Sequence, residues 1–396
     1  MEWKSHFPAL QNQGLIYCDS AATTHKPQSV IDAITRFYSS AYAPIGRGLY
    51  TSGEQATRKY EAAREAVANF FGAERFDSIV FTKNATEGIN MVAWGWATGI
   101  LQPGDEIVVS QLEHHSHWLV WQRVAQQCNV TIRYIPVHNS GMLDCSRLED
   151  IITSATKIVA ISAQSNVVGM ATPLATVTKR ARASDAYIVV DASQYAPRHR
   201  HMLQHHDWDF CVWSAHKMLG PTGLGVLYVA PRHHKHFGPY QYGGGMVYTT
   251  TPSVYWREMP YRCEAGSPPS AQVVGYHAAL TFLQECDMQA LRQHEIALCA
   301  YVVEKICTIP GVHIIGDPER IIKEGHLVSF YHDSVSAHDI AMYLDTWHMC
   351  VRSGHHCCQP LHAALGIRSS VRVSFYGYNT HDDAQQVVLA LQQLLS

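Results

Sequence analysis

Lys217 is the residue whose position best suits covalent chemistry. It comes soon after the apolar run 210–213 and just before the Gly-Pro-Thr-Gly turn at 220–223. A lysine that forms a Schiff base must be partly desolvated so that its amine can be neutral. The competing interpretation is a surface lysine beside a glycine-rich turn. A nucleotide-binding loop is excluded, because in such a loop the lysine follows the glycines.

Asp191 ends another apolar run, 187–191, and Gln194 comes three residues later. A carboxylate at that point can keep a pyridine nitrogen protonated and so make the ring an electron sink. Gln194 can hydrogen-bond a ring hydroxyl. An aspartate at a strand end is, taken alone, an ordinary capping or turn residue. Its combination with Lys217, which also follows a strand, is much more specific.

A phosphate site is predicted at residues 83–88, which join a strand to a helix. Backbone N–H groups and the Thr86 hydroxyl can hold a phosphate at the positive end of that helix. The same residues fit plain helix capping, with Asn84 as the cap and Glu87 three residues on, and both interpretations can hold. His114 follows the run 106–110, where an imidazole can stack on a planar ring and move protons.

Cys357 has the neighbours of a reactive thiol. Arg352, His355 and His356 precede it, and positive neighbours favour the thiolate form. A metal site at residues 355–358 is disfavoured, because adjacent residues on one short loop seldom reach tetrahedral geometry. A disulfide to Cys358 is expected only as an oxidation product, and a buried structural cysteine fits poorly among polar neighbours. Cys357 is therefore the predicted nucleophile.

An alternation of strands and helices must position these residues. Apolar runs predict strands at 79–82, 106–110, 158–162, 187–191, 210–213 and 225–229, with helices such as 86–95 and 176–184 between them. Nearly unbroken apolar strands are typical of a sheet that is covered on both faces. Chemistry in such folds gathers at the carboxyl ends of the strands, where the polar residues above fall.

The C-terminal third has a more mixed order. We expect a long helical stretch at 271–308, strands at 312–314 and 327–330, a helix at 338–344, a strand at 371–375 and a final helix at 382–395. This order favours a smaller α+β domain. The predicted domains are a large one at 15–265 and a small one at 266–396 that includes residues 1–14, with the active site in the cleft between them.

Composition excludes several classes of protein. Of 396 residues, 47% are hydrophobic and 16% are charged, and the formal net charge is −3. Large cores are therefore expected, and no basic stripe suggests nucleic acid. There is no secretory signal, and no apolar run approaches the ~18 residues of a membrane span. The 11 cysteines form no C-x-x-C pair, so a reducing cytoplasm is the expected location.

Together the motifs resemble the type II (sulfur-mobilisation type) cysteine desulfurases, within class V of the fold-type I pyridoxal-phosphate (PLP) enzymes. The likeness runs from about residue 15 to the C-terminus. It is carried by residues 17–22 (YCDSAA), 86–90 (TEGIN), 113–115 (EHH), 165–167 (SNV), 214–217 (SAHK), 220–223 (GPTG), 264–268 (EAGSP), 352–357 (RSGHHC) and 378–380 (YNT). The resemblance implies an α/β, fold-type I PLP-dependent transferase, with a mainly parallel, helix-covered sheet in the large domain.

The resemblance also implies roles for individual residues. Lys217 would bind pyridoxal 5'-phosphate covalently, Cys357 would take the sulfur, and His114 would stack on the ring and assist proton transfer. The other implied cofactor contacts are Asp191 at the pyridinium nitrogen, Gln194 at the ring oxygen, and Ala85, Thr86, Ser214 and His216 at the phosphate, with Ser267 reaching in from the other subunit of a homodimer. The implied substrate contacts are Arg372 and Asn166 at the carboxylate, with Arg352 and Ala22 nearby.

The chain departs from the family pattern in three places. The family often has His-Arg-Gly-x-His where this chain has Gly46-Arg47-Gly48-Leu49-Tyr50, so two imidazoles near the active-site entrance are missing. Ser267 replaces a usual threonine but keeps the hydroxyl. Cys358 stands where the family usually has a small residue, and we expect it to be a bystander.

The expected reaction converts L-cysteine to L-alanine and leaves a persulfide on Cys357. A sulfur-acceptor protein would then take the sulfur, for example for iron–sulfur cluster assembly. The alternatives in the same fold are a selenocysteine lyase, acting on L-selenocysteine, or another class V enzyme such as an aminotransferase, which needs no nucleophilic cysteine. A non-catalytic sulfur carrier is disfavoured, because Lys217 and Asp191 are also present. No metal, nucleic acid or membrane is expected as a partner.

Overall fold

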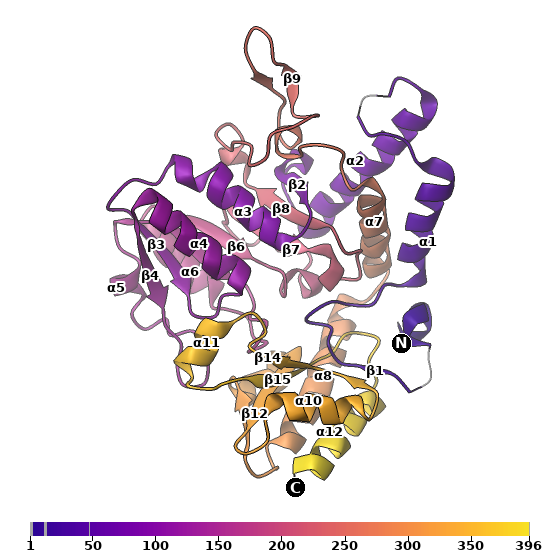
Figure 1. The fold of residues 1–396 in the computed structure, drawn as a ribbon, viewed down its shortest axis with the longest axis vertical. Coiled ribbons are helices and arrows are strands. Elements are labelled where there is room, and N and C mark those ends of the chain that lie inside the picture. The colour runs from indigo at the N-terminus through magenta and orange to yellow at the C-terminus, as the bar shows by residue number, and fades with distance from the viewer. Residues whose placement is uncertain (1–2, 12–13, 47, 396) are drawn as a thin grey trace.

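The fold is built around a seven-stranded sheet in the order β2-β8-β7-β6-β5-β3-β4 (Figure 1). The computed structural model describes residues 3–11, 14–46 and 48–395. β8 runs antiparallel to β2 and β7, and the other neighbouring pairs are parallel. The strands are β2 (Ile79–Thr82), β3 (Glu106–Ser110), β4 (Thr131–Ile135), β5 (Thr156–Ser162), β6 (Tyr187–Asp191), β7 (Phe210–Ser214) and β8 (Gly225–Val229).

Both faces of this sheet are buried, which explains its apolar strands. Ile107 and Val189 face a core shared with α3 (Ala85–Gly95) and α4 (His115–Cys128). Their neighbours Val108 and Ile188 face the opposite core, because successive side chains on a strand point to opposite faces. That second core also contains residues of α2 (Thr51–Phe71), α6 (Leu174–Ala183) and α7 (Ser270–Gln284). Two further helices of this half are α1 (Gln28–Arg36) and α5 (Leu148–Ile151).

The strands predicted for this sheet all form, but β4 was not predicted. Its five residues, Thr-Ile-Arg-Tyr-Ile, mix polar and apolar side chains, and only the last of them is buried. β4 lies at the edge of the sheet, next to β3. An edge strand lacks the unbroken apolar run that marks the central strands.

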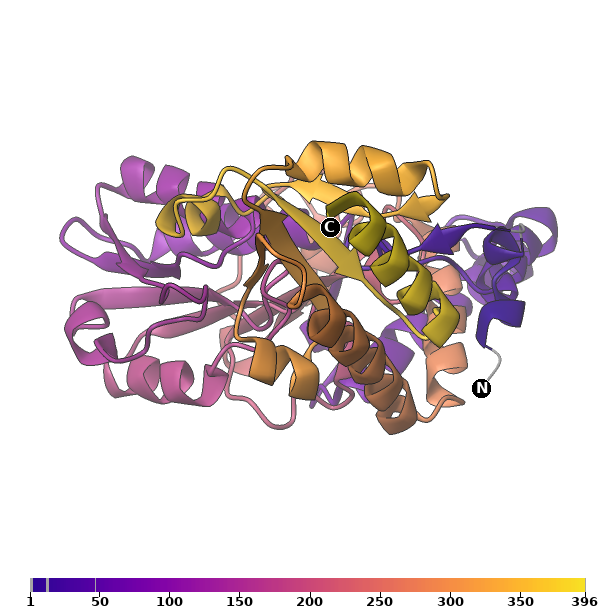
Figure 2. The same cartoon turned by 90° about the horizontal axis from the view of Figure 1, so that it is seen from below.

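A smaller sheet of four antiparallel strands has the order β11-β12-β15-β14. Its strands are β11 (Val312–Ile315), β12 (Leu327–His332), β14 (Arg352–Gly354) and β15 (Ser370–Ser374). The helices of this half are α8 (Met288–Ile306), α9 (Pro318–Glu324), α10 (Ala337–Asp345), α11 (Gln359–Ala364) and α12 (His381–Leu395). α8 and α12 pack side by side (Figure 2).

The helical stretch predicted at 271–308 is two helices rather than one. The chain leaves α7 at Gln284 and starts α8 at Met288. Asp287 caps the new helix by accepting hydrogen bonds from the backbone N–H groups of Gln289 and Ala290. A side-chain cap of this kind satisfies free N–H groups at a helix start. It therefore favours the start of a new helix at a point where the hydrophobic periodicity of the sequence shows no interruption.

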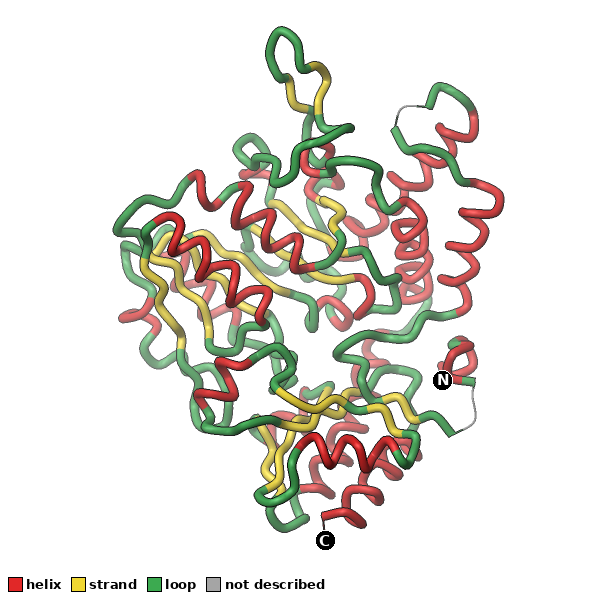
Figure 3. Tube along the Cα trace, viewed as in Figure 1, coloured by secondary structure: helices red, strands yellow, loops and turns green. Residues whose placement is uncertain are grey.

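The N-terminal segment joins the two halves. β1 (Ile16–Tyr17) pairs in parallel with β13 (Met349–Cys350), and Asp19 forms a β-bridge with Ser374. The chain then continues as a loop towards α1 (Figure 3). This path places residues 21–23 between the two sheets. α7 follows the predicted domain boundary at 265–266, yet it packs against α1 and α2, which precede that boundary. The boundary therefore stays a prediction.

A hairpin of β9 (Val247–Thr249) and β10 (Tyr255–Trp256) projects from the body of the molecule (Figure 1). In the described part of the chain, no helix combines the length and apolar character that a membrane crossing requires.

A buried ion pair ties α2 to the segment before α7. Arg64 is fully buried, and its guanidinium donates to both carboxylate oxygens of Glu264 at 2.7 and 2.9 Å. Glu264 also accepts hydrogen bonds from the Tyr60 hydroxyl and the Phe81 backbone N–H. Arg64 also donates from Nε to Glu61 at 2.9 Å, but Glu61 is partly exposed, so loss of Glu264 leaves the buried guanidinium poorly compensated.

We therefore expect Glu264→Gln to lower the free energy of unfolding by about 3 kcal/mol, measured by urea denaturation. Glu54→Gln is the control, because the Glu54–Arg58 pair is exposed on both sides. It should change stability by less than about 0.5 kcal/mol. Equal stabilities of the two variants would contradict a structural role for the buried pair.

Candidate active site

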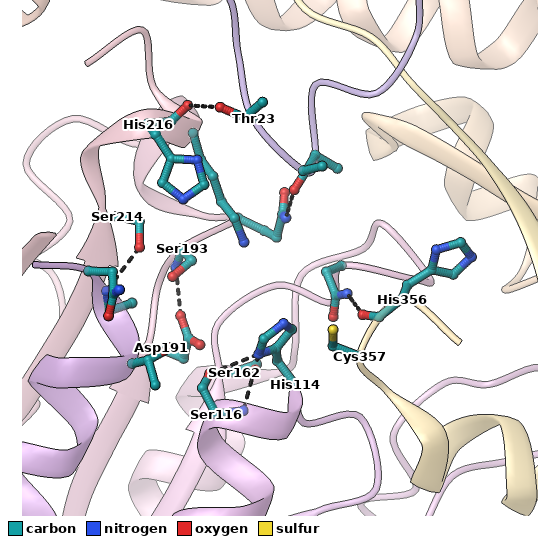
Figure 4. A pocket seen from close by; sticks show the side chains of 18 of the residues that line it. Thr23, His114, Ser116, Ser162, Asp191, Ser193, Ser214, His216, His356 and Cys357 are labelled. Atoms are coloured by element: carbon teal, nitrogen blue, oxygen red, sulfur yellow. Dashed lines mark hydrogen bonds between the residues drawn. The ribbon is translucent and has the colours of Figure 1, made fainter. Parts of the chain in front are cut away.

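One cavity of about 360 Å³ lies at the carboxyl ends of β5, β6 and β7, facing the small sheet (Figure 4). All the predicted site residues except Ser267 line it. These are Ala22, Ala85, Thr86, His114, Asn166, Asp191, Gln194, Ser214, His216, Lys217, Arg352, Cys357 and Arg372. Ser267 is exposed and does not line the cavity within this chain. Lysine and cysteine, 140 positions apart in the sequence, therefore face one space.

Lys217 is held by the turn that follows β7. The backbone carbonyl of His216 accepts hydrogen bonds from the Thr24 N–H at 2.9 Å, the Thr23 hydroxyl at 3.2 Å and the Lys26 amine at 3.1 Å. The N-terminal loop thus fixes the peptide just before the lysine. Burial lowers the pKa of the Lys217 amine, although Asp191 opposes this shift. Its neutral form is therefore easier to reach than that of a surface lysine.

Asp191 and Gln194 are both buried at the end of β6. One carboxylate oxygen of Asp191 accepts the Ser193 N–H at 2.9 Å. The Gln194 side-chain amide donates to the Ala21 carbonyl at 2.8 Å, and its oxygen lies 3.3 Å from His326 Nε2. These bonds hold both side chains at the cavity wall.

His114 caps the N-terminus of α4 with its own ring. Its Nδ1 accepts the Ser116 backbone N–H at 3.2 Å and lies 2.8 Å from the Ser116 hydroxyl. Burial, together with the nearby Lys217 charge, lowers the His114 pKa to about 4. The ring is therefore neutral at pH 7, and because Nδ1 accepts a hydrogen bond, the proton sits on Nε2. His114 thus offers the cavity an N–H donor.

The start of α3 has the predicted helix cap, and its polar groups bear on the predicted phosphate site. Asn84 caps the helix by accepting the Glu87 N–H at 2.9 Å, and Glu87 accepts the N–H of Lys83, the residue before the cap, at 2.6 Å. The Ala85 N–H donates to the Ser214 hydroxyl at 2.9 Å. His216 Nδ1 is buried and has no hydrogen-bond partner within the described residues. This set of hydroxyl, imidazole and N–H groups at a helix N-terminus suits an anion.

Residues 355–358, here called the Cys357 loop, present an exposed thiol to the cavity. The Asn166 amide donates to the His356 carbonyl at 2.7 Å, and the His115 N–H donates to the Cys357 carbonyl at 2.7 Å. His356 and Cys357 both have left-handed backbones, with φ of 52° and 56°. This conformation costs a non-glycine residue roughly 1–3 kcal/mol, so the surrounding contacts must hold it.

Cys358 points the other way. It is fully buried, and its Sγ donates to the Leu112 carbonyl at 3.3 Å. Burial, and next the charge of Glu113, raise the pKa of this thiol. The two adjacent cysteines therefore have opposite environments, and only Cys357 is placed to react.

Two arginines share one carboxylate beside the loop. Arg352 donates to both oxygens of Asp19 at 2.8–3.1 Å, and Arg372 donates to Asp19 at 3.1 Å and to the Asn166 carbonyl at 2.9 Å. Arg372 is buried and its Nε has no partner within the described residues. Two cations against one anion leave net positive charge, which favours an anionic ligand.

Several residues that line the cavity were not predicted as site residues. Thr23, Ser116, Ser162, Gln164 and Ser193 were not singled out at all, and Asn84 and His356 were named only as a helix cap and as a neighbour of Cys357. Ser162 ends β5 and Ser193 follows the end of β6, so position at a strand end could have identified them. Asp19 carried no such signal. Among the described residues, no cluster of three or more His, Cys, Asp or Glu side chains could hold a metal ion.

Comparisons with known proteins agree on one family. The model of the family Aminotransferase class-V matches residues 16–387. A cysteine desulfurase of Haloferax volcanii is 38% identical over 379 residues, 95% of this chain and 88% of the relative. The crystal structure of an Escherichia coli cysteine desulfurase, in an S-sulfonic acid form, has a TM-score of 0.92 at 34% identity and covers 100% of this chain and 98% of that chain. A mutant of C-DES with glycine covalently linked to its PLP cofactor has the same fold, with a TM-score of 0.84 at 21% identity and 98% of each chain covered.

The contrast between the adjacent cysteines can be tested by alkylation. With limiting iodoacetamide and mass spectrometry, we expect Cys357 to be modified at least about tenfold faster than Cys358, because the thiolate is the reacting form. Cys307, on the surface at the end of α8, serves as an ordinary exposed thiol for reference. Labelling of Cys358 at the rate of Cys307 would show that its burial is not maintained in solution.

Proposed function

Because the chain belongs to the class V aminotransferase family and, within it, to the cysteine desulfurases, we propose that Cys357 takes the sulfur of L-cysteine in a cavity it shares with Lys217. The resemblance and the fold-type I architecture inferred from the motifs are confirmed. One observation carries the assignment of residues. The thiol of Cys357 and the amine of Lys217 line the same cavity.

The side chains in the cavity fit pyridoxal 5'-phosphate, the cofactor of this family. The buried His216 Nδ1 lacks a partner within the described residues, and a phosphate oxygen would supply one. Asp191 is a buried carboxylate, and Lys217 has the lowered pKa that a Schiff-base lysine needs. When bound, the cofactor withdraws electrons from the substrate α-carbon and so eases loss of its proton.

Each predicted cofactor contact receives a role on these grounds. Lys217 would hold the cofactor covalently, Asp191 would keep the pyridinium nitrogen protonated, and Gln194 would bind the ring oxygen. His114, whose Nε2 carries the proton, would contact the ring. The phosphate is held by Ala85, Thr86, Ser214 and His216, which gather at the N-terminus of α3.

The substrate carboxylate binds to Arg372, with Asn166, Arg352 and Ala22 around it. Arg372 suits this task because a guanidinium can grip a carboxylate with two parallel hydrogen bonds. The net positive charge left beside Asp19 supports the same assignment. Lys217, once free, takes the α-proton, since its lowered pKa favours the neutral amine.

Sulfur transfer then takes place at Cys357. Its thiolate attacks the γ-sulfur of cysteine, so an S–S bond forms while the C–S bond breaks. The electron pair of the broken bond stays with the carbon fragment, which gains a proton and leaves as alanine. His114 is placed to assist this proton transfer. The balance is L-cysteine plus Cys357 thiol giving L-alanine plus Cys357 persulfide.

A homodimer in the cytoplasm, with Ser267 of one subunit reaching the phosphate of the other, completes the proposal. Two features support the dimer. Ser267 is exposed, and the β9–β10 hairpin carries exposed aromatic side chains, with Tyr248 70% and Tyr255 62% accessible. Exposed apolar surface of this kind suits a protein interface. A sulfur-acceptor protein would approach the exposed thiol of Cys357.

The departure at 46–50 also bears on acceptor access. Gly46 and Tyr50 occupy the two positions where the family often has an imidazole, so neither position carries one. Tyr50 is 50% exposed, and Leu49 beside it is 99% exposed. Residue 47 lies outside the described residues. We propose that this chain relies less on imidazole contacts at its entrance than its relatives do.

We expect Cys357→Ser to retain the cofactor absorbance but to lose alanine and sulfide formation by more than about a thousandfold, because a serine hydroxyl is a much weaker nucleophile than a thiolate. Cys358→Ala is the matched control. It should keep at least about a third of the activity, since it changes a buried side chain by one atom. Desulfuration by the serine variant at the normal rate would show that Cys357 is not the nucleophile.

Lys217→Ala should remove the visible absorbance of the bound cofactor and abolish turnover, because no other lysine among the described residues lines the cavity. Absorbance scans before and after gel filtration measure this loss. Lys323→Ala, on the surface of α9, is the control and should leave both unchanged. Normal absorbance in the Lys217 variant would place the covalent link elsewhere.

A further inference from the structure

Beneath the Cys357 loop lies a buried polar pair, His362 on α11 and Ser370 on β15. The Ser370 hydroxyl oxygen is 3.0 Å from His362 Nε2 and 3.0 Å from His356 Nε2. The exposed fractions of Ser370, His362 and His356 are 0, 1 and 7%. A single hydroxyl thus bridges two buried imidazoles, one of them next to the nucleophile. The chemistry proposed above gives this pair no role.

The direction of every hydrogen bond in this group can be worked out. His362 Nδ1 lies 3.0 Å from the Cys358 backbone carbonyl, which can only accept, so Nδ1 carries the proton. Burial lowers the His362 pKa, so the ring is neutral and its Nε2 is an acceptor. The Ser370 hydroxyl must therefore donate to His362 and accept from His356 Nε2–H. The chain runs from His356 through Ser370 to His362 and ends at the Cys358 carbonyl.

This direction leaves His356 Nδ1 without a proton. Burial, and next the Arg372 charge, lower the His356 pKa to about 2, so the ring stays neutral. Nδ1 of His356 is buried and has no partner, and the same holds for Nε of Arg372, both within the described residues. Arg372 and Ser370 are two residues apart on β15 and so share a face. The neutral imidazole therefore sits beside the guanidinium without adding a second positive charge.

The loop needs a constraint of this kind. Its two left-handed residues, His356 and Cys357, would relax to an ordinary backbone if the loop were free. The donors from Asn166 and His115 hold the side of the loop that faces the cavity. The opposite side is held by the bridge at Ser370 and by the His362 bond to the Cys358 carbonyl.

We propose that His356, Ser370 and His362 form one directed hydrogen-bond chain that holds the Cys357 loop in the conformation from which the thiol attacks. Ser370 and His362 are positioning residues, since they act on the thiol only through the loop. The inference rests on the proposed role of Cys357 as nucleophile, but the loop conformation itself can be measured without turnover.

Hydrogen–deuterium exchange of the substrate-free holoenzyme tests the chain. Ser370→Ala and His362→Leu should each speed exchange in the peptide covering 354–361 by about tenfold or more. The double variant should exchange no faster than either single variant, because the chain is already broken. Ser78→Ala is the matched control, since it removes a buried serine that contacts a histidine, His234, at 3.1 Å, far from the cavity. It should leave this peptide unchanged.

Kinetics give a second readout. Each broken-chain variant should lower kcat by about tenfold to a hundredfold and leave KM for L-cysteine within about twofold, because a misplaced nucleophile slows reaction without weakening binding. His362→Gln keeps an acceptor for the Ser370 hydroxyl and should lie between wild type and His362→Leu. If Ser370→Ala does not fold, His362→Gln still tests the hydrogen-bond chain.

Two results would overturn the inference. One is unchanged exchange at 354–361 in His362→Leu. The other is a double variant whose effect equals the product of the single effects, since independent contacts would behave in that way. Failure of the proposed function is recognised separately. In that case Cys357→Ser would keep turning over cysteine, whatever the exchange of the loop.

Discussion

Two backbone carbonyls of the Cys357 loop are held by donors from the opposite wall of the cavity. The Asn166 amide and the His115 N–H each approach within 2.7 Å of a loop carbonyl. Because these donors belong to the large-sheet half and the loop belongs to the small-sheet half, the two bonds help to join the halves, together with the Arg372 bond to the Asn166 carbonyl and the Ser329 bond to the Val167 carbonyl. The two bonds also hold the left-handed backbone of His356 and Cys357, and this backbone sets the direction of the Cys357 thiol. The shared cavity, its charge balance and the proposed chemistry all depend on these contacts between the two halves.

Burial controls the protonation states in the cavity. It lowers the pKa of Lys217 and that of His114, so groups that are cationic or partly cationic in water become able to be neutral. The positive charge remains on the arginines, which do not lose it, and Asp19 offsets only part of it. The cavity therefore separates two tasks. In the proposed reaction, permanent charge would attract the anionic substrate, while neutral nitrogen atoms would be available to exchange protons.

Much of the fold could be predicted because burial on both faces leaves a plain pattern in the sequence. β5, β6 and β7 are nearly all apolar, and each ends at a polar residue that lines the cavity. What could not be predicted depends on contacts between distant residues. Asp19 meets arginines 333 and 353 positions later, and no local pattern announces such a pair. The break between α7 and α8 was hidden for another reason. A single capping aspartate interrupts an apolar periodicity that continues on both sides.

The pairing of β1 with β13 has a consequence for biosynthesis. Residues near the start of the chain, Asp19 to Thr23, close a cavity whose other wall contains Arg352, Cys357 and Arg372. The large sheet can form while the chain is still emerging from the ribosome, because domains fold as units from the N-terminal side. The pocket itself cannot be complete until the chain has been made past Arg372. A nascent chain that already bears Lys217 therefore has no Cys357 opposite it until about 140 further residues have been added.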